Sequence, residues 1–153
     1  MKRIRAVSII VSFLLVVLCS CNNRNDPETK YQCSICVGMS FEDVEATLRD
    51  FSTFEYIGYL FYRDTEGQNV VARFDQDMKR IEEIKMFDPV SIDAQAFETL
   101  RVGMTIYEVV ERIGLPTGSY TFGIASLNFE SKDGTVAWVQ LDGDKVIDIS
   151  IKS

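Results

Sequence analysis

Cysteine is the residue type in this chain with the most obvious capacity for chemistry. Two of the four cysteines form the pair Cys33-Ser34-Ile35-Cys36, a spacing that also serves thiol–disulfide exchange in exported proteins. Redox pairs of that kind stand at the start of a helix that follows a strand, whereas this pair comes before the first helix that the sequence predicts. We therefore expect Cys33 and Cys36 to form a structural disulfide, and a redox protein using them stays an alternative.

The other combinations of reactive side chains are incomplete. The chain has no histidine, which excludes Ser-His-Asp and Cys-His catalysis and leaves the two thiols short of a zinc site. The run Asp142-Gly143-Asp144 resembles a calcium loop, but it lacks the later glutamate and the full spacing. We predict no catalytic residue, no metal and no cofactor, and therefore a protein that is not an enzyme.

The N-terminal 20 residues are typical of an export signal. Lys2, Arg3 and Arg5 precede an apolar run that is too short to span a bilayer. The sequence Leu18-Cys19-Ser20-Cys21 then resembles the bacterial lipobox, in which the last cysteine carries the lipid. We predict a signal peptide over 1–20 and lipidation of Cys21, which would anchor the protein in the bacterial envelope through its acyl chains.

Charge and composition narrow the class of partner. Without the three basic residues of the signal, 13 basic side chains stand against 23 acidic ones, and the formal net charge moves from −7 to −10. Nucleic acids and anionic lipid headgroups favour basic partners, so neither is expected to bind. Residues 21–32 carry few apolar side chains and are predicted to be a lipidated flexible tether.

An internal repeat organises the remaining chain, because 37–86 matches 102–151 at a constant offset of 65 residues without a gap. Val37-Gly38-Met39-Ser40 corresponds to Val102-Gly103-Met104-Thr105, and the pattern continues through Val71-Ala72 and Val136-Ala137. We predict a first repeat over 33–87, a linker over 88–101 and a second repeat over 102–153.

Each repeat is predicted to hold one helix and a three-stranded antiparallel meander. Ser40 and Thr105 are helix caps, and apolar residues then recur at helical spacing. The stretch 79–86 has helical propensity, but the repeat register favours a strand. We expect an α+β fold in which both meanders form one continuous sheet with the helices on one face. The predicted strands are 55–63, 69–74, 80–87, 119–129, 135–141 and 145–152.

A known family shares the motifs of the second repeat. Leu100-x-Val102-Gly103-Met104-Thr105, Val109 and Ile113-Gly114-Leu115-Pro116 are similar to the opening motif of the SmpA/OmlA (BamE-like) outer-membrane assembly lipoproteins, and 142–146 resembles that family's closing turn and strand. The first repeat lacks the Gly-x-Pro stop and is assigned through the repeat. A tandem pair also resembles the β-lactamase-inhibitor protein, whose two repeats form one concave sheet that grips an enzyme.

The resemblances imply a protein that acts by binding another protein. The expected partner is the outer-membrane assembly machinery, and the expected location is the outer membrane. An inhibitor of an extracytoplasmic enzyme is the alternative. The candidate contacts come from the strand pattern: Trp138 and Arg73 are predicted on the sheet face that points away from the helices, where Tyr56 and Tyr62 can add aromatic rings.

Overall fold

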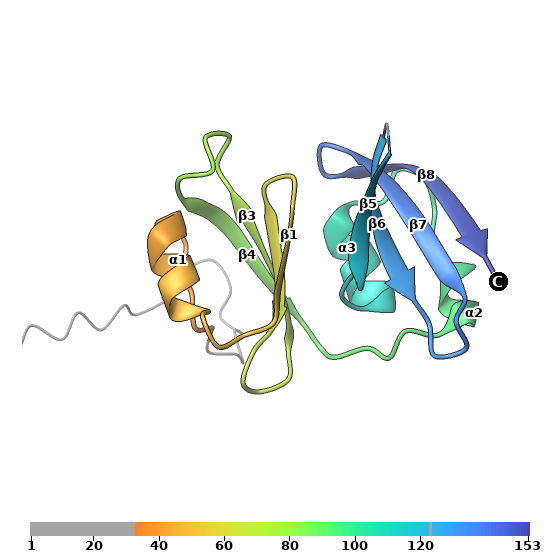
Figure 1. The fold of residues 1–153 in the computed structure, drawn as a ribbon, viewed down its shortest axis with the longest axis horizontal. Helices are drawn as coiled ribbons and strands as arrows, with labels where there is room; N and C mark the ends of the chain where they lie inside the picture. The colour runs from red at the N-terminus through yellow and green to blue at the C-terminus, as the bar shows by residue number, and fades with distance from the viewer. Residues whose placement is uncertain (1–32, 123) are drawn as a thin grey trace, which may run out of the picture.

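In the computed structural model, the described residues are 33–122 and 124–153, and they form two units of helix and sheet (Figure 1). The predicted signal peptide, Cys21 and the tether lie outside the described residues, so lipidation and anchoring stay predictions. Within the described residues, no helix combines the length and the apolar character that a membrane crossing requires.

The first unit begins with a short helix and continues as an antiparallel sheet. Helix α1 spans Phe41–Thr47 and is capped by the Ser40 hydroxyl, which accepts a hydrogen bond from the Asp43 amide. Within the ambiguous stretch 79–86, residues 81–86 lie in a strand, as the repeat register predicted, and the strand begins one residue later than expected. The sheet contains, in spatial and chain order, β1 (Thr53–Tyr56), β2 (Tyr59–Arg63), β3 (Asn69–Phe74) and β4 (Ile81–Phe87).

The second unit repeats this plan after a linker that contains the short helix α2 (Ala94–Phe97). Helix α3 (Ile106–Ile113) starts with a capping box between Thr105 and Glu108. It ends at Gly114, whose φ of 92° suits glycine. The family-like motif therefore has a local role as the start and stop of this helix. The second sheet contains β5 (Gly118–Phe122), β6 (Ile124–Glu130), β7 (Val136–Asp142) and β8 (Lys145–Lys152).

The predicted register of 65 residues holds at both ends of each unit. The Gly38 amide donates to the Ile81 carbonyl at 2.8 Å, and the Gly103 amide donates to the Val146 carbonyl at the same distance. In the middle the register is wrong by two residues, because β6 is two residues longer than β2, and the turn between β7 and β8 is shorter than the turn between β3 and β4. A shift of two keeps every side chain on its predicted face.

Each unit has four strands, not the predicted three. The stretch 55–63 is a hairpin, in which Tyr56 pairs with Tyr59 around a two-residue turn. Ile57 and Gly58 both have positive φ there, 41° and 80°, as such hairpin turns require. The stretch 119–129 also divides into two antiparallel strands, β5 and β6. In the first unit, the apolar character of 55–63 on both faces makes two adjacent strands resemble one long strand.

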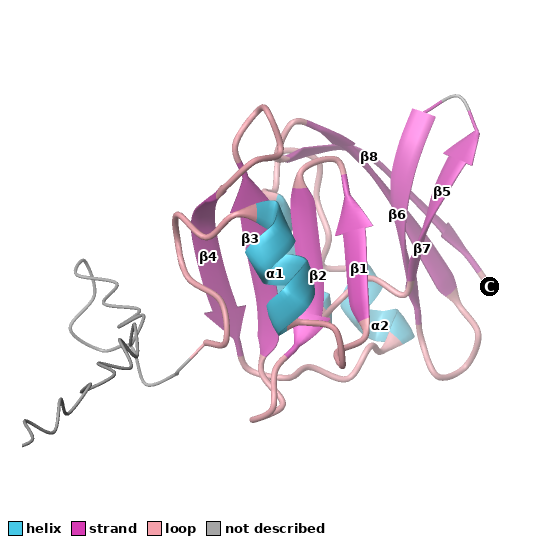
Figure 2. Ribbon diagram, turned by 60° about the vertical axis from the view of Figure 1, so that its left-hand side comes forward, coloured by secondary structure: helices cyan, strands magenta, loops and turns pink. Residues whose placement is uncertain are grey.

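The two sheets are separate, which corrects the prediction of one continuous sheet with helices on one face. Helix α1 covers one face of the first sheet (Figures 1 and 2), and α3 lies between the first sheet and the second (Figure 1). The core residues follow this order of layers. One cluster joins Val44 of α1 and Leu48, which caps the end of this helix, to the first sheet. The larger cluster joins α3 to Phe61 and Val71 of the first sheet and to the inner face of the second.

The helices differ at the positions that decide this stacking. Tyr107 and Val110 of α3 are buried, while the residues 65 positions earlier, Glu42 and Glu45 of α1, are exposed. Tyr107 and Val110 lie three residues apart, so they share one side of the helix. Helix α3 thus has apolar side chains for two sheets, and α1 has them for one.

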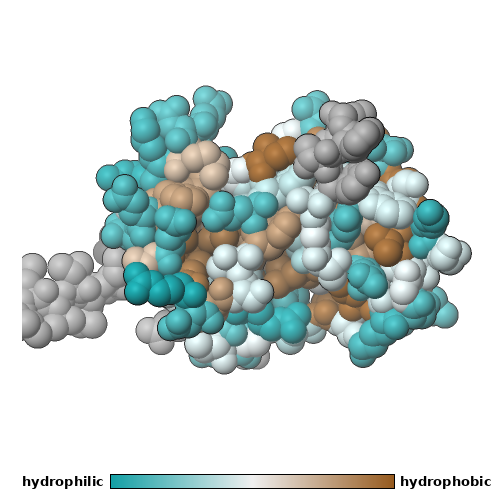
Figure 3. Space-filling model, in the orientation of Figure 1, coloured by the Kyte–Doolittle hydropathy of each residue, from teal (hydrophilic) through white to brown (hydrophobic). Residues whose placement is uncertain are grey.

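Burial along the strands reflects the same layers. Residues Tyr59 to Tyr62 of β2 are all buried, because the first sheet has a helix on each face. In β7 buried and partly buried residues alternate, because among the described residues a helix covers its inner face and none covers the other. On the side drawn in Figure 3, apolar side chains gather in the middle of the molecule, between the two sheets, with polar side chains around them.

Candidate binding surface

The second sheet has one face that points away from α3, and we call it the outer face. Alternate residues of its strands, such as Leu127 and Val139, are buried in the core, so the residues between them point outward. Trp138 lies at its centre and pairs with Asn128 on β6 and Ser150 on β8. The other members are Gly118, Ser126, Glu130, Val136, Gln140, Ile147, Asp148 and Lys152.

The apolar part of the outer face consists of Trp138, Val136 and Ile147. Trp138 and Val136 are partly buried, whereas 47% of Ile147 is exposed. Ile147 occupies a β-bulge, where residues 147 and 148 both lie opposite Gln140. The bulge places Ile147 on the outer face, where regular alternation along β8 would have placed the polar residue Asp148 alone.

On the outer face, Asn128 has a buried polar atom that is not satisfied by a hydrogen bond within the described residues. Its side-chain oxygen is buried, and it accepts no hydrogen bond from the described residues. A buried acceptor without a donor is costly to the fold. Gly118 pairs with Asn128 across β5 and β6, and a Cβ at Gly118 would meet no atom within 4 Å. The surface beside Asn128 is therefore open.

In the first sheet, the corresponding face is not open but covered by α3. The pair Val71 and Lys85 there corresponds to Trp138 and Ser150, and the pair Arg73 and Glu83 corresponds to Gln140 and Asp148. The bulge residue Glu82 corresponds to Ile147. Both Glu82 and Glu83 form ion pairs with Arg73.

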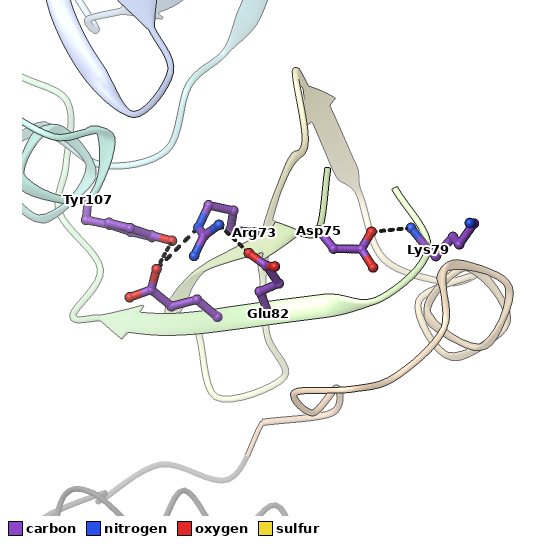
Figure 4. Close-up of polar contacts among 6 residues, drawn as sticks. Arg73, Asp75, Lys79, Glu82 and Tyr107 are labelled. Atoms are coloured by element: carbon purple, nitrogen blue, oxygen red, sulfur yellow. Dashed lines mark hydrogen bonds and ion pairs between the residues drawn. The ribbon is translucent and has the colours of Figure 1, made fainter. Parts of the chain in front are cut away.

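A polar cluster holds α3 onto the first sheet (Figure 4). The Tyr107 hydroxyl donates to Glu83 Oε2 at 2.9 Å, and Arg73 Nε lies 3.4 Å from the same oxygen. Lys85 Nζ lies 4.1 Å from the centre of the Tyr107 ring. Burial, together with the negative charge of Glu83, raises the pKa of Tyr107. Burial works against a charged Glu83, yet the hydrogen bond from Tyr107 and the charge of Lys85 lower its pKa.

The four residues predicted to bind a partner do not share a surface. Trp138 lies on the outer face, as the strand pattern predicted. Arg73 and Tyr56 belong to the face of the first sheet that α3 covers. Tyr62 is buried on the opposite face, under α1, with its hydroxyl 3.1 Å from Cys33 Sγ. Of these four residues, Trp138 alone lies on the outer face.

Three outer-face residues were missed by the sequence reasoning, namely Asn128, Ile147 and Asp148. The alternation along 124–130 could have placed Asn128 opposite Trp138, had the hairpin been recognised. Ile147 depends on the bulge, and no turn residue in the sequence marks it.

The cysteine pair lies at the beginning of the described chain. Cys33 and Cys36 are both partly buried, and Ile35 between them is completely buried with the residues under α1. Ile35 thus attaches the segment that contains both cysteines to the core of the first unit. The disulfide between Cys33 and Cys36 stays a prediction. Among residues 33–122 and 124–153, no three potential metal ligands come together, and this includes the turn at Asp142-Gly143-Asp144.

Comparison with known proteins provides no family for this chain. It matches no family model, and the curated proteins contain no match to it.

Proposed function

We propose that this chain is a lipid-anchored protein of the bacterial envelope that binds a partner protein through the outer face of its second sheet and performs no chemistry itself. One observation carries the proposal: Trp138 lies on the outer face, whose counterpart in the first sheet is buried under a helix. A tryptophan surrounded by polar groups is typical of the anchor of a reversible interface.

The process that we propose is outer-membrane protein assembly, with the protein held at the outer membrane by lipid on Cys21. This part is supported by the resemblance of 100–116 and 142–146 to the assembly lipoproteins and by the lipobox-like end of the signal segment. The alternative, an inhibitor or binder of an extracytoplasmic enzyme, came from the resemblance to a protein whose two repeats form one concave sheet. The described residues form two separate sheets, so this likeness in sheet architecture does not support the alternative.

The first test is cross-linking in living cells. A photoreactive amino acid replaces Trp138 in one strain and Lys132 in another. Lys132 is the control because it is exposed in the turn between β6 and β7. Capture of barrel-assembly proteins from position 138 and not from position 132 is the expected result. A captured extracytoplasmic enzyme would support the inhibitor instead, and equal capture from both positions would overturn binding at the outer face.

A further inference from the structure

We propose that the partner binds the outer face with an amphipathic α-helix, which docks near Trp138 as α3 docks on the first sheet. This inference rests on the proposed function, because it specifies which kind of partner segment the outer face accepts. The starting observation is internal to the chain: the equivalent sheet face already binds a helix in the first unit.

The docking of α3 shows what this sheet face requires from a helix. Tyr107 places its ring at 6.1 Å from that of Tyr59 in an edge-on arrangement, and its hydroxyl donates to Glu83. Val110, one turn later on the same side, is completely buried. An aromatic anchor with a donor at its tip, followed by an aliphatic residue, is thus the pattern that fits.

The outer face has matching groups at the equivalent positions. Asp148 takes the place of Glu83, and no hydrogen bond or ion pair to its carboxylate is found within the described part of the chain. Trp138 takes the place of Val71 and provides the apolar centre. A partner side chain in the position of Tyr107 would contact Trp138 and donate to Asp148.

The charges favour another protein over a second copy of this chain. A second copy would have to present α1, because its α3 is buried between two sheets. The outward residues Glu42 and Glu45 of α1 would then face Glu130 and Asp148, and like charges repel. We therefore expect a helix from a different protein, with lysine or arginine beside its apolar stripe.

The test maps cross-links at the level of single residues in the full-length protein in its own cells. Photoreactive probes replace Trp138, Ile147 or Ser150, one at a time, and the linked partner residue is identified by mass spectrometry. Ala46 on the exposed side of α1 is the control position. The expected result is that the three outer-face probes link to one segment of one protein, at residues three or four apart.

Two substitutions check that the contact depends on the outer face. Trp138→Ala should reduce capture from position 150 about tenfold or more, which is the range for an anchor residue. Gly118→Leu should reduce it as well, because the new side chain enters the open surface beside Asn128 and meets no atom of the fold near its Cβ. The second variant keeps the test valid if the first one fails to fold.

The outcomes separate the inference from the proposed function. Linked residues two apart would indicate an extended segment, and links to a second copy would indicate self-association. Links scattered over several loops of one protein would also overturn the helix. In the first and third cases binding to a partner at the outer face still stands. If none of the three probes captures a protein, both the helix and the proposed binding surface are wrong.

Discussion

Removing the hydroxyl group that links α3 to the first sheet should weaken the fold by a measurable amount. In Tyr107→Phe the ring stays in the core, and the hydrogen bond of 2.9 Å to Glu83 is lost. A hydrogen bond to a charged group contributes about 1.5–3 kcal/mol. The Glu83 side chain is 36% exposed and keeps Arg73 and Lys85 nearby, so water and these cations replace part of the loss. We expect the free energy of unfolding to fall by about 1–2 kcal/mol.

A double-mutant cycle with Glu83→Gln measures the pairwise part of this effect. Urea unfolding of the chain without its signal segment, followed by circular dichroism, gives the four free energies of unfolding. We expect a coupling of about 1 kcal/mol between positions 83 and 107 and a melting temperature about 3–8 °C lower for Tyr107→Phe. A coupling below about 0.3 kcal/mol would refute the view that this hydrogen bond holds α3 on the first sheet.

The pH dependence of the same variant gives a second check. The pKa of Tyr107 is raised in the folded state, so its contribution to stability is complete below the ordinary tyrosine value of about 10 and is lost as the pH rises through the folded pKa. The pKa of Glu83 is lowered, so its contribution is present above about pH 4.3 and is lost as the pH falls through its folded pKa. Tyr107→Phe should therefore lose stability less steeply above pH 10 than the original chain. Equal slopes in that range would contradict the assignment.

Three further predictions concern the turn, the N-terminal anchor and the lipid. Gly58→Ala should cost about 1–2 kcal/mol in urea unfolding because φ is +80° there, whereas Gly118→Ala, with open space and no positive φ, should change stability little. Ile35→Ala should lower the free energy of unfolding by about 2–5 kcal/mol because the side chain is completely buried. Val37→Ala is the near-neutral control because 54% of Val37 is exposed. Similar losses of stability in the two variants would show that Ile35 does not anchor the N-terminal segment. Cys21→Ser should abolish labelling by radioactive palmitate and move the protein from the membrane fraction to the soluble fraction; unchanged labelling would contradict the lipobox assignment.

Several features of the fold could be predicted from the sequence because they depend on local chemistry or on the repeat. The caps Ser40 and Thr105 start helices where the sequence placed them, and the stretch that includes Ile84 is a strand despite its helical propensity. The face of Trp138 was also predicted correctly, since alternation along a strand with one covered face leaves a clear pattern.

Other features could not be predicted because tertiary packing determines them. Residues 55–63 are apolar on both faces, and this pattern fits one long strand as well as a hairpin buried between two helices. Gly58 was the available signal for the turn, but Ile57 beside it is an unusual residue for positive φ and concealed it. The bulge that exposes Ile147 leaves no mark in the sequence at all.

The arrangement of the two units depends on the places where the repeats differ and not on those where they agree. Shared positions such as Val44 and Val109 attach each helix to its own sheet, and on their own they would allow two independent units. Tyr107 and Val110 of α3 have no apolar counterparts in α1, where glutamates stand at the equivalent positions. They give α3 a second apolar side that covers the first sheet. The outer face of the second sheet is the next surface in the same series, and a tryptophan occupies its centre where the first sheet has Val71. The described residues form two units of helix and sheet, and the helix from another protein that we propose at the outer face would continue their stacking.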